Sequence, residues 1–192
     1  LGWPAKADSA LVQQMIDLAL SQDILVVAAA GNDGTEALVR PCTFKGVICV
    51  GSHDPDGALS HFSNYGAGVD IAAPGLNILS LFPVGNRNLR PEIFLERAGY
   101  EMKFGTSMAT PFVTGILARL LNAGFSPGEA KARLFAAARP IVSGNARAPM
   151  QLAMAIQTGN ADLGEALSPR LKPRPVFIPI AKQAVVIPWD RL

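Results

Sequence analysis

Apolar residues fall at helical spacing in one part of the chain and in short continuous runs in the next. Within residues 8–20, three large apolar side chains recur at helical spacing, namely Leu11, Met15 and Leu18, with Val12 and Ala19 beside them. This predicts a helix that covers a sheet, with Asp8 or Ser9 as its cap. Residues 24–30 are then wholly apolar and end in Gly31-Asn32-Asp33-Gly34. Such a run before a turn is typical of a buried parallel strand, so the order of elements predicts an α/β fold with a mostly parallel sheet flanked by helices.

Three further apolar runs, at residues 47–50, 69–73 and 78–82, predict more short strands. Residues 83–102 are polar and contain several glycines, prolines and asparagines. Long connections of this kind are uncommon in compact domains, and this one indicates an enlarged loop.

Helices are predicted again in the second half of the chain. The small and apolar residues after Ser107 predict a buried helix that begins near this serine. Ser126-Pro127-Gly128-Glu129 combines a cap, a proline at the first position and an acid in the first turn, which predicts a helix over residues 127–138. A short helix is expected at residues 150–156.

The tail of the chain differs from the rest. Residues 1–157 are expected to form one globular unit, whereas residues 158–192 contain five prolines and two apolar runs. The prolines exclude a long helix. We expect an extended tail that lies on the domain surface, or against a portion of the protein absent from this chain, because it carries too much apolar surface for a free linker.

Composition narrows the class of protein. With 192 residues, 49% of them hydrophobic and 17% charged, the chain can bury a sizeable core. A net charge of +2 without a run of basic residues argues against a nucleic-acid partner. No apolar stretch approaches the ~18 to 20 residues that would span a bilayer. The opening Leu1-Gly2-Trp3-Pro4 has neither a Met nor a signal-peptide pattern, so Leu1 is not expected to be the natural start.

The two cysteines, Cys42 and Cys49, are too few for a disulfide framework and lack the spacing of a zinc site. They flank a short turn and could be bonded to each other. Cys49 lies in an apolar run, however, where a buried free thiol is the commoner outcome, and this is the state that we expect.

Ser107 is the candidate for chemistry. The start of a helix presents unpaired N–H groups and the positive end of the macrodipole, which favour negative charge developing beside a serine that attacks a carbonyl. Pro111 removes the usual helical donor to the Ser107 carbonyl or bends the helix slightly. A serine that merely caps a core helix would fit the same pattern, so these features alone leave both alternatives open.

The segment Gly105-Thr106-Ser107-Met108-Ala109-Thr110-Pro111 resembles the nucleophile motif of subtilisin-like serine proteases, the subtilases. Phe112 stands where many members have a histidine, but that histidine is not the catalytic one. The resemblance implies that Ser107 is the nucleophile and that Gly105 and Thr106 lie in the substrate-binding region. Seven consecutive motif positions weigh against the capping alternative.

The segment Ala29-Ala30-Gly31-Asn32 resembles the oxyanion-hole segment of the same family. The resemblance implies that the amide of Asn32 donates a hydrogen bond to the tetrahedral intermediate. Alone, Asn-Asp-Gly would be interpreted as a turn. Its place after a predicted buried strand, where open α/β sheets bind ligands, favours the functional interpretation.

The resemblance also implies the primary specificity pocket. Leu1-Gly2 and Ala29-Ala30-Gly31 resemble its two backbone walls, Val39 is expected at its floor and Asp33 at its rim. Small walls and a valine floor predict a medium-sized apolar or aromatic side chain before the scissile bond. Asp33 would add only a weak attraction for lysine or arginine. In the subtilases, the loop that corresponds to residues 83–102 borders the leaving-group side of the cleft.

Two further segments resemble the family and extend the match to residues 1–156. Residues 41–51 resemble a family segment that ends in Val-Ile-x-Val-Gly. Residues 59–75 contain Phe-Ser-Asn-x-Gly followed by Asp-x-x-Ala-Pro-Gly. The resemblance favours a secreted or extracytoplasmic protein. It allows a structural calcium ion, but no ligands, cofactor or metal-binding residues can be assigned.

The general base and the acid that orients it, normally His and Asp, are missing. The chain has only His53 and His61, and neither precedes the Gly-Thr of the family's histidine motif. The Asp-Thr/Ser-Gly motif is absent too. The resemblance therefore implies a partial, subtilisin-like domain, whose Asp and His lie in an N-terminal portion of the same protease. This chain alone is expected to be inactive.

Two functions remain in view. The chain is either part of a serine endopeptidase that cleaves peptides or proteins, or a catalytically inactive scaffold that binds peptides or a partner protein. We favour the first, because Asn32 and Ser107 are needed together only to form and stabilise the acyl-transfer intermediate. A scaffold has no chemical need for both. An α/β-hydrolase requires a buried strand directly before the serine, and residues 101–104 are too short and polar for one.

Overall fold

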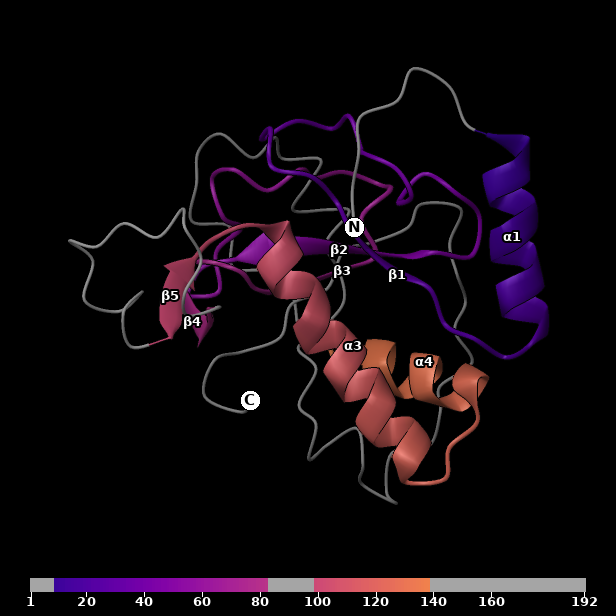
Figure 1. Cartoon of the computed structure of the whole chain (residues 1–192). Helices are drawn as coiled ribbons and strands as arrows, with labels where there is room; N and C mark the ends of the chain where they lie inside the picture. The colour runs from indigo at the N-terminus through magenta and orange to yellow at the C-terminus, as the bar shows by residue number, and fades with distance from the viewer. Residues whose placement is uncertain (1–8, 83–98, 139–192) are drawn as a thin grey trace.

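The computed structural model describes residues 9–82 and 99–138 (Figure 1). Its elements, in chain order, are α1 (Ala10–Ser21), β1 (Val27–Ala29), β2 (Ile48–His53), β3 (Ile71–Pro74), β4 (Ile78–Leu81), β5 (Tyr100–Lys103), α3 (Thr106–Asn122) and α4 (Pro127–Ala136). Predictions that concern Leu1, Gly2, the helix at residues 150–156 and the tail lie outside the described residues.

The centre of the fold is a parallel sheet in the order β1-β2-β3. Ile48 and Val50 of β2 pack with residues of α3 and α4, whereas Cys49 between them packs with Ile16 of α1. Because side chains alternate between the faces of a strand, α1 covers one face of the sheet and α3 and α4 cover the other (Figure 1). The predicted α/β architecture is confirmed.

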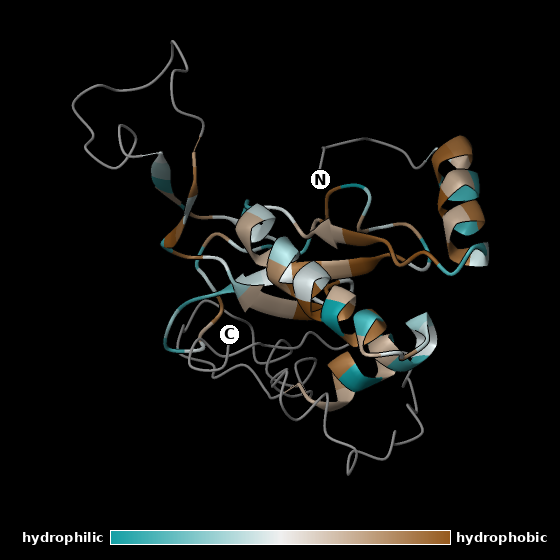
Figure 2. Ribbon diagram, turned by 60° about the horizontal axis from the view of Figure 1, so that its bottom comes forward, coloured by the Kyte–Doolittle hydropathy of each residue, from teal (hydrophilic) through white to brown (hydrophobic). Residues whose placement is uncertain are grey.

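Helix α1 forms where it was predicted, and Ser9 is its N-cap. The three side chains at the predicted spacing are not the ones that face the sheet. Leu11, Met15 and Leu18 are exposed, and the helix packs instead through Ile16, with Val12 and Leu20 beside it. Apolar residues thus lie on more than one side of the helix, which Figure 2 colours partly brown, and helical spacing alone cannot tell which side is buried.

The predicted strand at residues 78–82 forms as β4 but does not join the parallel sheet. It pairs antiparallel with β5, and the two form a separate ribbon. Residues 100–102 therefore belong to a strand and not to the predicted loop, which is a correction. The strand is exposed along most of its length, so no buried strand precedes Ser107 and the α/β-hydrolase alternative gains no support.

Cys42 and Cys49 form a disulfide bond, with their Cα atoms 4.9 Å apart. The expectation of a free thiol was wrong. Both cysteines are buried, as expected for Cys49. The turn between Cys42 and β2 also brings the two sulfur atoms within bonding distance, and the apolar run around Cys49 gave no sign of this. The bond ties this turn to the central strand of the sheet.

Helix α4 has the predicted start. The hydroxyl of Ser126 accepts from the Glu129 N–H, and the Glu129 carboxylate accepts from the Ser126 N–H at 2.9 Å, which completes a capping box. The helix ends at Ala136, two residues earlier than predicted. Among the described residues, no helix is both long and apolar enough to cross a membrane.

Candidate active site

The start of α3 and the end of β1 lie side by side, although they are 74 residues apart in sequence. The backbone N–H of Thr106 donates to Oδ1 of Asn32 at 2.8 Å, and the Thr106 hydroxyl donates to the same oxygen at 2.9 Å. The same hydroxyl accepts from the Gly31 N–H at 3.2 Å. Thr106, the residue directly before Ser107, thus ties the start of α3 to Gly31 and Asn32, which follow β1.

These bonds fix the orientation of the Asn32 amide. A backbone N–H can only donate, so the Asn32 atom that faces Thr106 must be the oxygen. The Nδ2 group then faces away from Thr106 with two donor hydrogens. Asn32 as a whole is exposed.

Ser107 is the second residue of α3 and is exposed, while Gly105, Thr106 and Ala109 around it are buried. Its N–H belongs to the first helical turn and has no helical acceptor. Pro111, one turn later, has no N–H to donate to the Ser107 carbonyl. An exposed hydroxyl therefore stands at the positive end of a long helix, where negative charge is favoured.

Two glycines allow the close packing beneath the serine. Gly105 has φ 141°, donates to the Gly75 carbonyl at 2.8 Å and lies so close to Asn32 that an added Cβ would be 3.3 Å from Nδ2. A Cβ at Gly75 would collide with Ser52 and lie 2.8 Å from the Gly105 carbonyl oxygen. Larger residues at either position would displace the segment that leads into Ser107.

The predicted pocket residues lie in different environments. Ala29, Ala30 and Gly31 are buried at the end of β1. Val39 is half-buried beside them: its N–H donates to the Ala30 carbonyl at 3.4 Å, and its Cγ1 would lie 3.1 Å from a Cβ added at Gly31. Asp33 is exposed. Val39, which was expected at the floor of the pocket, thus lies beside Ala30 and Gly31, and the substrate-binding roles stay predictions.

Asn64 was not singled out by the sequence, although its Phe-Ser-Asn-x-Gly segment was noted. Its side chain is fully buried beneath the loop that carries Asn32. It bonds this loop through both ends of its amide. Four hydrogen bonds between distant segments leave no mark in local sequence patterns, so only the structure identifies this residue.

The two histidines have different surroundings. His53 is fully buried at the end of β2, and its Nδ1 lies 2.8 Å from the carbonyl oxygen of Asp54. His61 is exposed and packs edge-on against the ring of Phe62. Within residues 9–82 and 99–138, no group of three or more His, Cys, Asp or Glu side chains could hold a metal ion.

Comparison with known proteins finds relatives among proteases. The chain is 42% identical over 118 residues to an extracellular basic protease of Dichelobacter nodosus. The aligned region covers 61% of this chain and 19% of that protein. It is 38% identical over 118 residues to subtilisin Savinase of Lederbergia lenta, covering 62% of this chain and 38% of that protein. The chain therefore spans well under half the length of these relatives.

Solved structures of proteases also superpose on this chain. The prenylagaramide maturation protease PagA superposes with a TM-score of 0.62 at 28% identity, covering 86% of this chain and 57% of that chain. A cold-adapted subtilisin-like serine proteinase superposes with a TM-score of 0.61 at 29% identity, covering 77% of this chain and 49% of that chain. The sequence profile of the Subtilase family matches residues 3–166. This chain belongs to the subtilase family.

Proposed function

We propose that this chain is the C-terminal portion of the catalytic domain of a serine endopeptidase, in which Ser107 is the nucleophile and Asn32 an oxyanion-hole donor. The observation that carries the proposal is the pair of hydrogen bonds from Thr106 to Oδ1 of Asn32. They use Oδ1 of Asn32 and leave its two Nδ2 hydrogens for another acceptor, and Ser107 directly follows Thr106 at the start of α3. An N-terminal portion of the same protease, absent from this chain, would supply the Asp and the His.

In this mechanism the histidine takes the proton of the Ser107 hydroxyl as Oγ attacks the carbonyl carbon of the scissile peptide. The carbonyl oxygen becomes negatively charged and accepts from Nδ2 of Asn32 and from the Ser107 N–H. The histidine then gives its proton to the leaving amine, and an acyl-enzyme forms at Ser107. Water, activated by the same histidine, hydrolyses this ester and regenerates the serine.

Substrates would be peptides or proteins with a medium-sized apolar or aromatic side chain before the scissile bond. The position of Val39 beside Ala30 and Gly31 supports this, because its methyl groups occupy space that a glycine would leave open. Asp33 is exposed, so screening limits its attraction for a basic side chain. Strict cleavage after arginine, or after acidic residues, in a peptide-library profile would contradict this part of the proposal.

The protein would act outside the cytoplasm. The disulfide between Cys42 and Cys49 supports this location, because such bonds persist in oxidising compartments. The name of the Dichelobacter nodosus relative describes that protein as extracellular. A structural calcium ion remains a suggestion of the family resemblance.

The test is peptide hydrolysis by the complete protein, compared with its Ser107→Ala variant. We expect cleavage by the complete protein and no cleavage above background by the variant, because the acyl-enzyme cannot form without the hydroxyl. Peptide binding without cleavage by both proteins would instead identify an inactive scaffold.

A further inference from the structure

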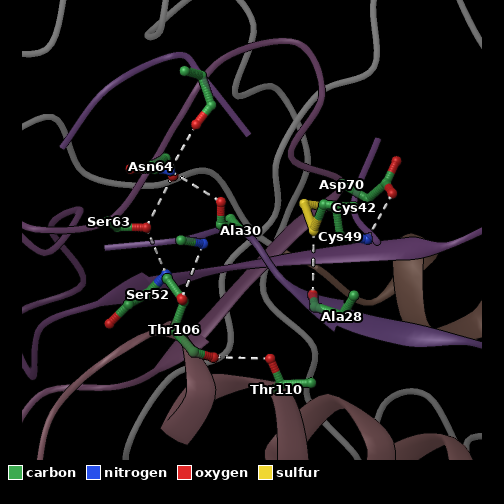
Figure 3. The surroundings of a disulfide bond; sticks show 12 residues. Ala28, Ala30, Cys42, Cys49, Ser52, Ser63, Asn64, Asp70, Thr106 and Thr110 are labelled. Carbon is green, nitrogen blue, oxygen red and sulfur yellow. Dashed lines mark hydrogen bonds between the residues drawn. A yellow bond between two sulfur atoms is a disulfide. The ribbon is translucent and has the colours of Figure 1, made fainter. Parts of the chain in front are cut away.

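Asn64 is a fully buried asparagine that bonds the Asn32 loop at four points through its side chain. Its Oδ1 accepts from the N–H of Asp33 at 2.8 Å and from the N–H of Thr35 at 3.3 Å. Its Nδ2 donates to the carbonyls of Ala30 at 3.1 Å and Ala37 at 2.8 Å. Figure 3 shows this amide beside Ala30, on the opposite side of the picture from the disulfide.

The four bonds use the whole hydrogen-bonding capacity of one carboxamide side chain. Two N–H groups face its oxygen and two carbonyls face its nitrogen. An aspartate could accept the first pair but, when ionised, could not donate to the second. An alanine would leave these backbone groups without their side-chain partner, which destabilises the folded state.

These contacts surround Asn32 without involving its side chain. Asn64 bonds the residue directly after it, Asp33, and its backbone N–H donates to the carbonyl of Gly31, the residue directly before, at 3.0 Å. Gly31 has φ 107°, and a Cβ there would collide with Nδ2 of Asn64. The backbone on both sides of Asn32 is therefore fixed from below by Asn64.

The side chain of Asn32 is held separately, from the side of α3, by Thr106. Asn64 places the backbone of Asn32, and Thr106 orients its amide. An oxyanion donor must lie within a few tenths of an ångström of its place, since it acts only on the charge of the transition state.

We propose that Asn64 is a positioning residue for the reaction: it holds the 30–37 loop so that Asn32 can donate to the oxyanion. The inference rests on the proposed function and adds a residue to the same site. Asn64 touches neither the substrate nor the nucleophile in this scheme. A purely structural role for Asn64 would lower stability without a specific dependence on Asn32, and this difference can be measured.

The experiment uses the complete protease and the variants Asn64→Asp and Asn64→Ala, each also combined with Asn32→Ala. We expect Asn64→Asp to lower kcat by roughly 10-fold to 100-fold with a change in KM below about 3-fold. The reason is that a misplaced Asn32 donor stabilises the transition state less, while substrate binding hardly changes. In the Asn32→Ala background the same change should lower kcat by less than about 3-fold, because the donor is already absent.

Asp70→Ala is the matched control. The Asp70 carboxylate also accepts from a backbone N–H, that of Cys49 in β2 at 2.9 Å, and Asp70 stands directly before β3. This variant should lower the melting temperature while its kcat stays within about 3-fold of the parent. Asn64→Asp keeps two of the four bonds, so it serves as the decisive variant if Asn64→Ala does not fold.

An unchanged kcat in Asn64→Asp, or the same fold loss with and without Asn32, would overturn the inference. If the parent protease does not hydrolyse peptides, or Ser107→Ala is equally active, the proposed function fails and this inference fails with it. An active parent whose Asn64 and Asn32 effects simply multiply would overturn only the role of Asn64.

Discussion

Two regions flank Ser107, and they are built in opposite ways. On one side, the 30–37 loop is held by hydrogen bonds from Asn64 and Thr106, both fully buried. On the other side, the ribbon of β4 and β5 leads directly into the serine segment and presents apolar side chains to solvent, namely Leu79, Leu81, Tyr100, Met102 and Phe104. Leu79 pairs with Met102 and Leu81 with Tyr100, so these four share one face of the ribbon.

The difference separates two kinds of contribution to catalysis. A polar donor for the transition state must be fixed before the reaction, and many buried hydrogen bonds can fix it. An exposed apolar surface cannot position a charge, but it can add binding energy for whatever chain passes over it. Changes in the loop should therefore act on kcat, and changes in the ribbon should act mainly on KM.

The largest effect is expected from Asn32→Ala in the complete protease. Turnover should fall by ~100-fold to 1000-fold with little change in KM, a magnitude carried over from the corresponding asparagine of subtilisin. Steady-state kinetics on a peptide substrate give both constants. An unchanged kcat would remove Asn32 from the site and with it the functional contrast between loop and ribbon.

The disulfide should matter for stability more than for turnover. Cys42 and Cys49 are 7 residues apart, and closing so short a loop is worth roughly 2 to 3 kcal/mol of unfolding free energy in the chain-entropy description. Replacing both cysteines by alanine should lower the urea midpoint accordingly, with kcat within about 3-fold of the parent. A kcat loss as large as that of Asn32→Ala would show that the disulfide also positions the loop.

The ribbon should give a smaller effect, on substrate binding. Phe104 is 64% exposed directly before Gly105, whereas Leu81 is 80% exposed at the far end of the ribbon. For substrates with an apolar residue after the scissile bond, Phe104→Ala should raise KM by about 3-fold to 10-fold, because about 0.6 to 1.4 kcal/mol of apolar contact is lost.

Leu81→Ala is the control for that prediction and should leave KM unchanged. Equal effects of the two variants would mean that the ribbon contributes through folding alone. If Phe104→Ala lowered kcat without changing KM, Phe104 would act on the transition state, as the 30–37 loop is expected to do, and not on substrate binding.

The smallest effect is expected far from both regions, at the start of α4. Hydrogen bonds from Ser126 to the Glu129 carboxylate lower the pKa of that group in the folded state. A lowered carboxyl pKa adds stability that is present above the unfolded pKa and is lost as pH falls through the folded pKa. Glu129→Gln should therefore be slightly less stable than the parent at pH 7 and nearly equal to it at pH 2 to 3 in thermal unfolding. A constant difference across this range would exclude the carboxylate as its cause.

Sequence patterns predicted those features that depend on local chemistry. The strand before Asn32, the helix that begins beside Ser107 and the start of α4 at Ser126-Pro127 all follow from neighbouring residues. Features that depend on distant contacts escaped prediction. Which stripe of α1 faces the sheet, the pairing of β4 with β5, the disulfide and the bonds of Asn64 are all decided by segments that meet only in the folded chain.

The most direct test of the central claim is covalent labelling of Ser107 by a fluorophosphonate, located by peptide mass spectrometry. In the complete protease, the Asp and His of the N-terminal portion should activate Ser107, and the probe should attach there and not in the Ser107→Ala variant. The isolated 192-residue chain should react no faster than an ordinary alcohol. Labelling of the isolated chain at the rate of the complete protease, or no labelling of Ser107 in the complete protease, would contradict the account.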